Sequence, residues 1–288
     1  MKNKLSLAKG YRARTIFQIC NFIFMLLVVA VMLIPLLKVL VDSLDVKGGY
    51  EFRLFPQEVS FDAYRRILTE PSLYKAFGVS FYVTVIGTVL ALVLSTMGAF
   101  VLTRKDMPGR KVFMYMMMFT MMFNGGIIPT YMLVKDLHLT NTLWAVILPL
   151  SINTYNLILL KNFFQDIPES LYESADLDGC SPMGIFTRIV LPMSKPAIAA
   201  IGLFYFVAYW NDWFNFTMYI QNSDLKNFQV KLREMVLTDD MGSNTDIAVF
   251  ANTLKNATII VAIIPVMIIY PFIQKYFTTG LNLGAVKG

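Results

Sequence analysis

Residues 166–192 read DIPESLYESADLDGCSPMGIFTRIVLP and form a polar interruption between two long apolar segments. The residues in this stretch that typically start and end helices predict two short helices joined by a turn. Asp166 can cap the first helix, and Pro168 falls where a first-turn proline is tolerated. Gly179 stands where a helix ends in a left-handed residue, and Ser181-Pro182 then supplies an N-cap and a first helical position.

The second of these helices is predicted to have one apolar face. Met183, Phe186, Ile189 and Val190 recur at spacings of three to four residues, which places them on one side of a helix, and Pro192 is expected to end it. An apolar face on a loop between two membrane spans needs a partner. We therefore interpret residues 166–192 as a docking element.

The composition is that of a membrane protein. Of the 288 residues 56% are apolar and only 15% are charged, whereas average soluble chains are roughly 45–50% apolar and about 25% charged. Cys20 falls in an apolar run and Cys180 in the polar loop, so we expect two unpaired thiols and no structural disulfide.

Six apolar segments are each long enough to cross about 30 Å of hydrocarbon, which predicts an all-α integral membrane protein with six transmembrane helices. A basic N-terminal segment (1–15) precedes them, and a short Gly-rich tail (278–288) follows the region 16–277. The predicted spans are 16–41, 76–102, 112–134, 142–164, 196–220 and 255–277.

The distribution of Lys and Arg predicts that both termini lie in the cytoplasm (N-in, C-in). With this orientation the inner segments hold 14 basic residues and the outer segments hold 10, and the excess sits at the short flanks of the spans. The loop 166–192 is then cytoplasmic. The same distribution explains the net charge of +6 without a nucleic-acid partner.

The polar loop also resembles a known signature. Glu173-Ser174-Ala175, Asp178-Gly179, Ile189 and Leu191-Pro192 resemble the EAA loop of ABC importer permeases, with Ser174 in place of the usual middle Ala. The resemblance extends over most of the chain. It includes Tyr209-Trp210-Asn211-Asp212 and the end of the chain, from Pro271 through Lys275-Tyr276-Phe277 to Gly284-Ala285-Val286-Lys287-Gly288. It is most similar to binding-protein-dependent carbohydrate permeases related to the smaller maltose permease subunit, especially the branch named after lipoprotein and complex-polysaccharide transport.

The resemblance implies a type I ABC importer permease fold in which the loop 166–192 carries a cytoplasmic coupling helix. Glu173 would pair with a basic group of an ATPase subunit, Ala175 would allow close approach, and Gly179 would make the turn. Ser174 and Asp178 complete the expected ATPase-coupling set.

The resemblance also implies the partners and the place of the protein. We expect a second, homologous permease subunit, two ATPase subunits, an extracellular or periplasmic solute-binding protein, a sugar substrate and membrane lipid. The chain would be a multi-pass protein of the bacterial cytoplasmic (inner) membrane.

The sequence offers no site for covalent chemistry. It contains no Gly-x-x-x-x-Gly-Lys-[Ser/Thr] loop, so ATP and Mg would bind to a partner ATPase and this chain would hold no cofactor. The single histidine, His138, leaves no Ser-His-Asp set and little room for a metal site. We therefore expect a transport subunit and no catalytic residues.

Polar side chains within the predicted spans are candidates for the substrate pathway, because sugars bind to amides, hydroxyls and aromatic faces. The candidates are Asn124, Asn153, Tyr155, Asn156, Tyr209, Asn211 and Asp212. The alternative is that such groups bond neighbouring helices together. For Asn211 and Asp212 the resemblance favours a structural or gating role near the outer mouth, and a partner such as Lys, Arg or a backbone amide is expected for Asp212.

Two other protein classes remain open. An ATPase-independent secondary transporter or channel would show repeated halves or ionisable residues deep in the spans, and neither is clear. An integral membrane enzyme would need acids, His or Cys clustered at one membrane face, and the acids are scattered. Which sugar is carried stays open, although the resemblance points to an oligosaccharide or polysaccharide fragment.

Overall fold

The computed structural model describes residues 2–45, 53–123, 125–238 and 245–284. These residues are almost entirely helical, and their only β-structure is an isolated bridge between Asp45 and Val59. The predicted all-α class is therefore confirmed. The chain groups into two compact units, residues 1–67 with 236–261 and residues 68–235 with 262–288, which are described separately.

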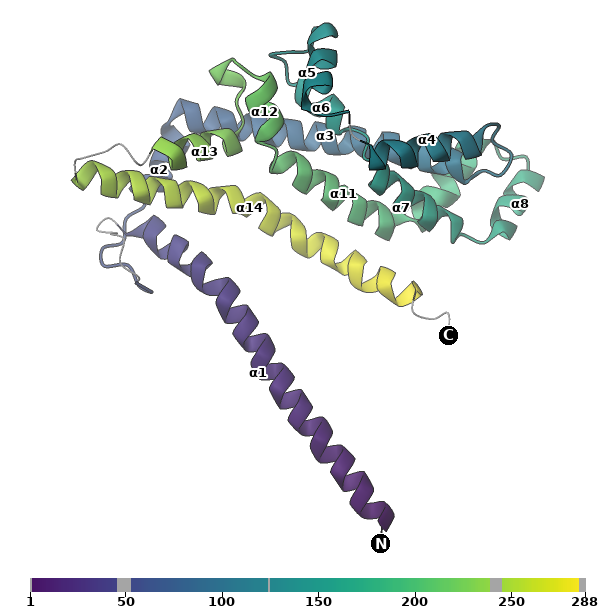
Figure 1. The fold of residues 1–288 in the computed structure, drawn as a ribbon, viewed down its shortest axis with the longest axis horizontal. Coiled ribbons are helices and arrows are strands. Elements are labelled where there is room, and N and C mark those ends of the chain that lie inside the picture. Colours follow the sequence, from purple (N-terminus) through teal and green to yellow (C-terminus); the bar gives the residue numbers. More distant parts are fainter. Residues whose placement is uncertain (1, 46–52, 124, 239–244, 285–288) are drawn as a thin grey trace. The chain divides into compact units, whose positions relative to one another are not determined.

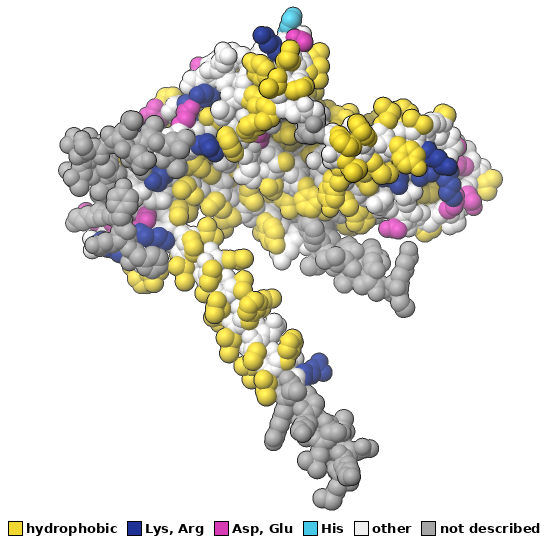
Figure 2. All heavy atoms as spheres, viewed as in Figure 1, with side chains coloured by type: hydrophobic (Ala, Val, Ile, Leu, Met, Phe, Trp, Pro, Cys, Tyr) yellow, Lys and Arg dark blue, Asp and Glu magenta, His cyan; other side chains and the backbone are white. Residues whose placement is uncertain are grey.

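The first unit contains α1 (Lys2–Leu44), most of α2 (Asp62–Thr69) and the beginning of α14 (Thr245–Gly284). The stretch Arg14–Leu44 of α1 has a mean hydropathy of 2.9, and none of its most apolar window is buried within the chain. Figure 2 shows hydrophobic side chains along this helix. An apolar helix without cover from its own chain fits a lipid or protein environment better than water.

The second unit is built around α3 (Pro71–Thr103), α7 (Thr154–Gln165) and α11 (Lys195–Trp210), which pack against one another (Figure 1). Small buried residues on α3 let the other two helices come close. Among them Ser95 forms a buried hydrogen bond with the hydroxyl of Tyr205 on α11, at 2.7 Å. The long helix α3 therefore forms the centre of this unit, against which α7 and α11 pack.

Shorter helices surround this centre. They are α4 (Arg110–Met122), α5 (Ile127–Asp136), α6 (Trp144–Leu150), α8 (Glu169–Leu177), α9 (Pro182–Ile185), a π-helical turn (Phe186–Val190), α10 (Leu191–Met193), α12 (Phe214–Tyr219), a 3₁₀ turn (Ser223–Leu225) and α13 (Phe228–Thr238).

Within the described part of the chain, three helices are long and apolar enough to cross a membrane, and three bent helix pairs raise the number of possible spans to six. The long stretches are Arg14–Leu44, Pro71–Thr103 and Phe250–Phe272. The bent pairs are α4 with α5, α6 with α7, and Pro182–Met193 with α11. Two of the bent pairs coincide with the predicted spans 112–134 and 142–164, whereas the third begins in the loop 166–192 and ends inside the predicted span 196–220.

Two of the predicted spans are interrupted at a polar side chain that bonds to the backbone at the start of the next helix. The span 142–164 bends by 47° between α6 and α7, where the side chain of Asn153 caps α7. The span 196–220 stops at Trp210 and restarts at Phe214, because Asp212 bonds to the backbone of the next helix. A polar side chain that caps a helix start breaks a span that hydropathy alone reads as continuous.

Candidate functional site

The loop 166–192 folds as two helical pieces around a glycine turn, as predicted. Gly179 has a φ of +73°, a conformation that costs other residues steric strain. The amide of Cys180 donates to the carbonyl of Ala175 at 2.9 Å, and the amide of Gly179 donates to Asp176 at 3.1 Å. This pair of bonds is a Schellman motif, and it fixes the direction in which the chain leaves α8.

The start of the second piece also matches the prediction, because the Ser181 hydroxyl accepts a hydrogen bond from the amide of Gly184 at 3.2 Å. Two details of the prediction were wrong. Asp166 ends α7 instead of capping α8, whose N-cap position is taken by Pro168. The second piece also continues one residue past Pro192, to Met193.

The residues of α8 divide between two faces. Ala175 is only 6% exposed and packs into the core of its own unit. Glu173, Ser174, Asp178 and Gly179 are exposed, so the predicted coupling set is brought together with Ala175 as its buried member.

Leu177 is a surface residue that the sequence analysis missed. It is 88% exposed although it is a large apolar side chain. The available signal was helical periodicity, because a residue two positions from the buried Ala175 points to nearly the opposite side of a helix.

Two basic residues at the end of α3, which the sequence analysis did not single out, hold α8. Arg104 lies 3.5 Å from the Asp176 carboxylate, and Lys105 lies 2.7 Å from that of Glu169. We call these two ion pairs the clasp. Ion pairs near the protein surface contribute only about 0.2–1 kcal/mol each to the free energy of unfolding. The clasp therefore matters more for the position of α8 than for the stability of the protein. Figure 2 shows acidic and basic side chains gathered at the α8 end of this unit.

A cavity of about 350 Å³ lies between α8 and the residues that follow α3. Its lining includes both basic residues of the clasp and the Glu173 carboxylate, which makes no ion pair within the described part of the chain. Tyr172 also lines it and donates to the carbonyl of Phe164 at 3.2 Å. Burial raises the pKa of Tyr172, and the positive charge of Arg104 partly opposes this.

Several predicted substrate-pathway residues form hydrogen bonds within the chain, one of them between helices and the others at helix starts. Tyr209 is 1% exposed, and its hydroxyl donates to the carbonyl of Ile147 at 2.8 Å. Asn156 is buried at the start of α7, where its amide donates to the Asn153 side chain at 3.1 Å. The Asp212 carboxylate accepts from the backbone and the side-chain amide of Asn215, at 3.1 and 3.0 Å, which confirms the expected backbone-amide partner.

The other pathway residues have exposed side chains. Asn153 and Asn211 are exposed, and Tyr155 is 52% exposed. Asn153 and Tyr155 lie at the break between α6 and α7, and Asn211 lies at the break between α11 and α12. Asn124 lies outside the described residues. The accessible candidates therefore sit where spans are broken.

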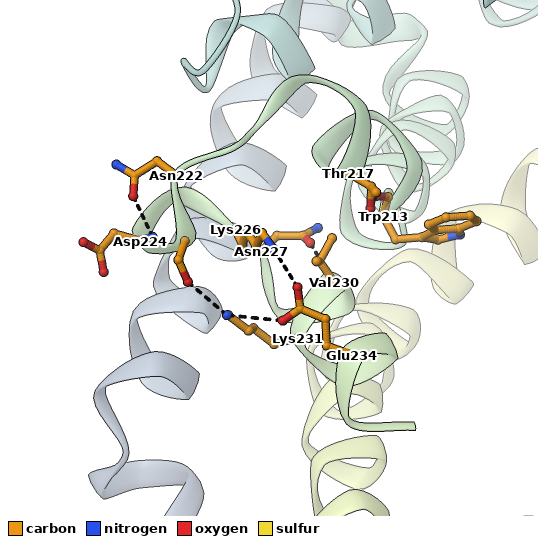
Figure 3. A network of polar contacts seen from close by, with 10 residues as sticks. Trp213, Thr217, Asn222, Asp224, Lys226, Asn227, Val230, Lys231 and Glu234 are labelled. Carbon is orange, nitrogen blue, oxygen red and sulfur yellow. Dashed lines mark hydrogen bonds and ion pairs between the residues drawn. The ribbon is translucent and has the colours of Figure 1, made fainter. Parts of the chain in front are cut away.

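A polar network joins α12, the 3₁₀ turn and α13 (Figure 3). Lys226 and Lys231 both bond to Glu234, at 2.7 and 3.3 Å. Burial alone would raise the pKa of the Glu234 carboxyl, but the hydrogen bonds and charges of the two lysines lower it below its ordinary value. The side chain of Asn227 donates to the Asp212 carbonyl at 2.6 Å, so α13 is tied to the break after α11.

The network and the clasp lie toward opposite ends of α3. The amide of Phe228 on α13 donates to Ser80, near the start of α3, at 2.9 Å, whereas the clasp begins at Arg104, just after α3 ends. Ser80 and Arg104 are 24 positions apart, which is roughly 36 Å along a helix. The two polar regions are therefore separated by slightly more than the roughly 30 Å of a bilayer's hydrocarbon core.

Comparison with known proteins gives one consistent answer. Residues 108–282 match the family model described as "Binding-protein-dependent transport system inner membrane component". The polygalacturonan/rhamnogalacturonan transport system permease protein YtcP of Bacillus subtilis is 44% identical over 95% of this chain and 99% of its own length. Protein LplC of the same organism is 39% identical over 96% of this chain and 97% of its own length.

A solved structure is also similar. It is a chain of a bacterial ABC transporter involved in the import of the acidic polysaccharide alginate. Its TM-score is 0.84 and its sequence identity is 30%, over 92% of this chain and 98% of the solved one.

Proposed function

Because the chain belongs to the family of binding-protein-dependent transport system inner membrane components, we propose that it moves an oligosaccharide through the membrane while separate ATPase subunits drive it. The substrate class rests on the relatives, whose names refer to polygalacturonan, rhamnogalacturonan and alginate. The chain itself does no covalent chemistry, and ATP and Mg bind to the ATPases.

The observation that carries this proposal is the shape of α8. It is a short helix with a buried Ala175, an exposed Leu177 and an exposed Glu173 carboxylate, ended by a fixed turn at Gly179. An exposed apolar side chain beside a carboxylate that makes no ion pair among the described residues suits a protein partner. Glu173, Ser174, Leu177 and Asp178 face that partner, while Ala175 and Gly179 hold the helix in place.

The movement follows from how α8 is attached. The clasp joins α8 to the end of α3, and α3 packs along α7 and α11. When ATP closes the ATPase subunits, α8 moves with them and pulls on the end of α3. The spans then change between inward-open and outward-open arrangements.

The proposal extends to the remaining parts of the assembly. Six spans run with both termini in the cytoplasm of a bacterial cell, and a second, related permease completes the pathway. A solute-binding protein delivers sugar to the end of α3 that carries α13. Asn153, Tyr155 and Asn211, with Asn124, offer polar groups to the sugar, while Tyr209, Asn156 and Asp212 support the walls of the pathway.

Uptake into proteoliposomes tests this function. The two permeases and the ATPases are reconstituted, the solute-binding protein is added outside, and entry of a labelled oligogalacturonide or neutral oligosaccharide is measured. We expect uptake that needs ATP, the ATPases and the binding protein together. Uptake at an equal rate without the ATPases would indicate a secondary transporter or channel, and no uptake of any oligosaccharide would contradict the function.

A further inference from the structure

We propose that Arg233, stacked on Trp213, binds the carboxylate of an acidic oligosaccharide at the outer end of the permease. This inference rests on the proposed function and makes its substrate class specific. The sugar would be a uronate, in which each residue carries a carboxylate in addition to hydroxyl groups.

The first argument is the geometry of the pair. The guanidinium carbon of Arg233 lies 3.8 Å from the centre of the Trp213 ring system, a cation–π contact. The indole meets the ring of Phe214 edge-on at 5.7 Å, and the backbone carbonyl of Trp213 accepts a hydrogen bond from the hydroxyl of Thr217 at 2.8 Å. A guanidinium held on an indole loses less conformational entropy when it binds a ligand.

The second argument is the partners of the neighbouring cations. Lys226 and Lys231 share Glu234, and Lys75 lies 3.8 Å from Asp224. Arg233 is exposed, and no carboxylate pairs with it among the residues that the structure describes. Its N–H groups are therefore available for a bidentate carboxylate, the ligand that the planar guanidinium matches best.

A carboxylate of the solute-binding protein could also meet Arg233, but two observations favour the sugar. Asn211, two residues before Trp213, is exposed and offers the amide groups that sugar hydroxyls bind. The similar transporters include one for polygalacturonan and rhamnogalacturonan and one for the acidic polysaccharide alginate.

The test compares two forms of one sugar in the complete reconstituted importer. Trigalacturonate carries three carboxylates, and its methyl ester has the same rings without the charges. For Arg233→Gln we expect the KM for trigalacturonate to rise about tenfold, in line with the loss of a charge-assisted hydrogen bond, and the KM for the ester to stay unchanged. Arg233→Lys keeps the positive charge, so its KM for trigalacturonate should rise less than that of Arg233→Gln. The control Lys75→Gln removes an exposed cation at the same end and should affect both sugars little.

The other outcomes would overturn the proposal. An equal loss for both sugars would assign Arg233 to packing or to docking of the binding protein. No change for either sugar would leave Arg233 without a role in recognition. If the unsubstituted importer carries neutral oligosaccharides but not trigalacturonate, this proposal fails while the proposed function stands. If it carries no oligosaccharide at all, the proposed function fails as well. If Arg233→Gln does not assemble, the comparison of the two sugars with Arg233→Lys decides.

Discussion

The ring of Tyr209 lies directly over Gly87, so that a Cβ atom on Gly87 would come within 2.6 Å of the Cζ atom of the tyrosine. Because Gly87 has no side chain, the hydroxyl of Tyr209 can reach past α3 and bond to the carbonyl of Ile147 at 2.8 Å. One close contact thus joins α3, α6 and α11, the helices through which movement of α8 would pass.

Gly87→Ala should therefore destabilise the permease. The added methyl group forces the tyrosine ring to move, and overpacking of this kind costs about 1–3 kcal/mol. Thermal unfolding of the detergent-solubilised protein measures the effect. Gly78→Ala is the matched control, since Gly78 lies on the same helix and a Cβ there meets nothing within 4 Å. Equal stability of the two variants would contradict the contact.

Gly179→Ala should weaken coupling with little loss of folding. A Cβ at Gly179 meets no neighbouring atom within 4 Å, so the cost comes from the left-handed backbone alone and is about 1–2 kcal/mol. We expect less ATP-driven uptake with an intact permease. Gly179→Asn is the control, because Asn tolerates this conformation better, and it should keep more uptake than the alanine variant. Equal uptake by the two variants would speak against a role for the turn.

The clasp predicts a charge-reversal result. Arg104→Glu places a third acid beside Asp176 and Asp106, since each of these carboxylates lies 3.5 Å from Arg104. We expect ATP hydrolysis to continue while the amount of sugar moved per ATP falls several-fold. Because the pair is exposed and contributes at most about 1 kcal/mol, folding should change little. The double variant Arg104→Glu with Asp176→Arg should recover coupling, and failure to recover it would show that the pair does not transmit the movement.

The Glu234 network predicts a dependence of stability on pH. The two lysines hold the folded-state pKa of this carboxyl below its ordinary value. Its contribution to the free energy of unfolding is therefore present above the ordinary carboxyl pKa and disappears as the pH falls through the lowered folded-state value.

Glu234→Gln removes this contribution, and the difference in unfolding temperature from the unsubstituted protein should be present at pH 7 and shrink toward low pH. A difference that stays constant or grows as the pH falls would contradict the network. The control is Lys231→Met, which takes away one of the two cations and should reduce the difference in the same pH range.

Patterns in the sequence predicted the parts of the fold that local chemistry decides. The left-handed turn at Gly179 and the cap at Ser181 both form, because each depends on residues within a few positions. The all-α class was predicted from the apolar composition and the length of the apolar segments. The breaks within the spans 142–164 and 196–220 were not predicted, because hydropathy averages over a window and does not register a single capping side chain such as Asn153 or Asp212.

Contacts between distant segments could not be read from the sequence. Lys105 and Glu169 are 64 positions apart, and nothing local relates them. The burial of Tyr209 and Asn156 was equally hidden, because a polar residue in an apolar segment has the same pattern whether it faces a pathway or a neighbouring helix. The residues of the expected coupling set lie on α8 and in the turn that ends it, and the structure separates the buried Ala175 from the exposed Leu177.

Crosslinking of α8 tests the central claim most directly. In a background without Cys20 and Cys180, one cysteine is placed at Leu177, which is 88% exposed, and in a matched control one is placed at Ala175, which is 6% exposed. We predict that a short bifunctional thiol reagent links the cysteine at position 177 to an ATPase subunit, that nucleotide changes the yield, and that position 175 gives little product. A cysteine at position 177 that captures no ATPase in a permease that still transports would contradict the account.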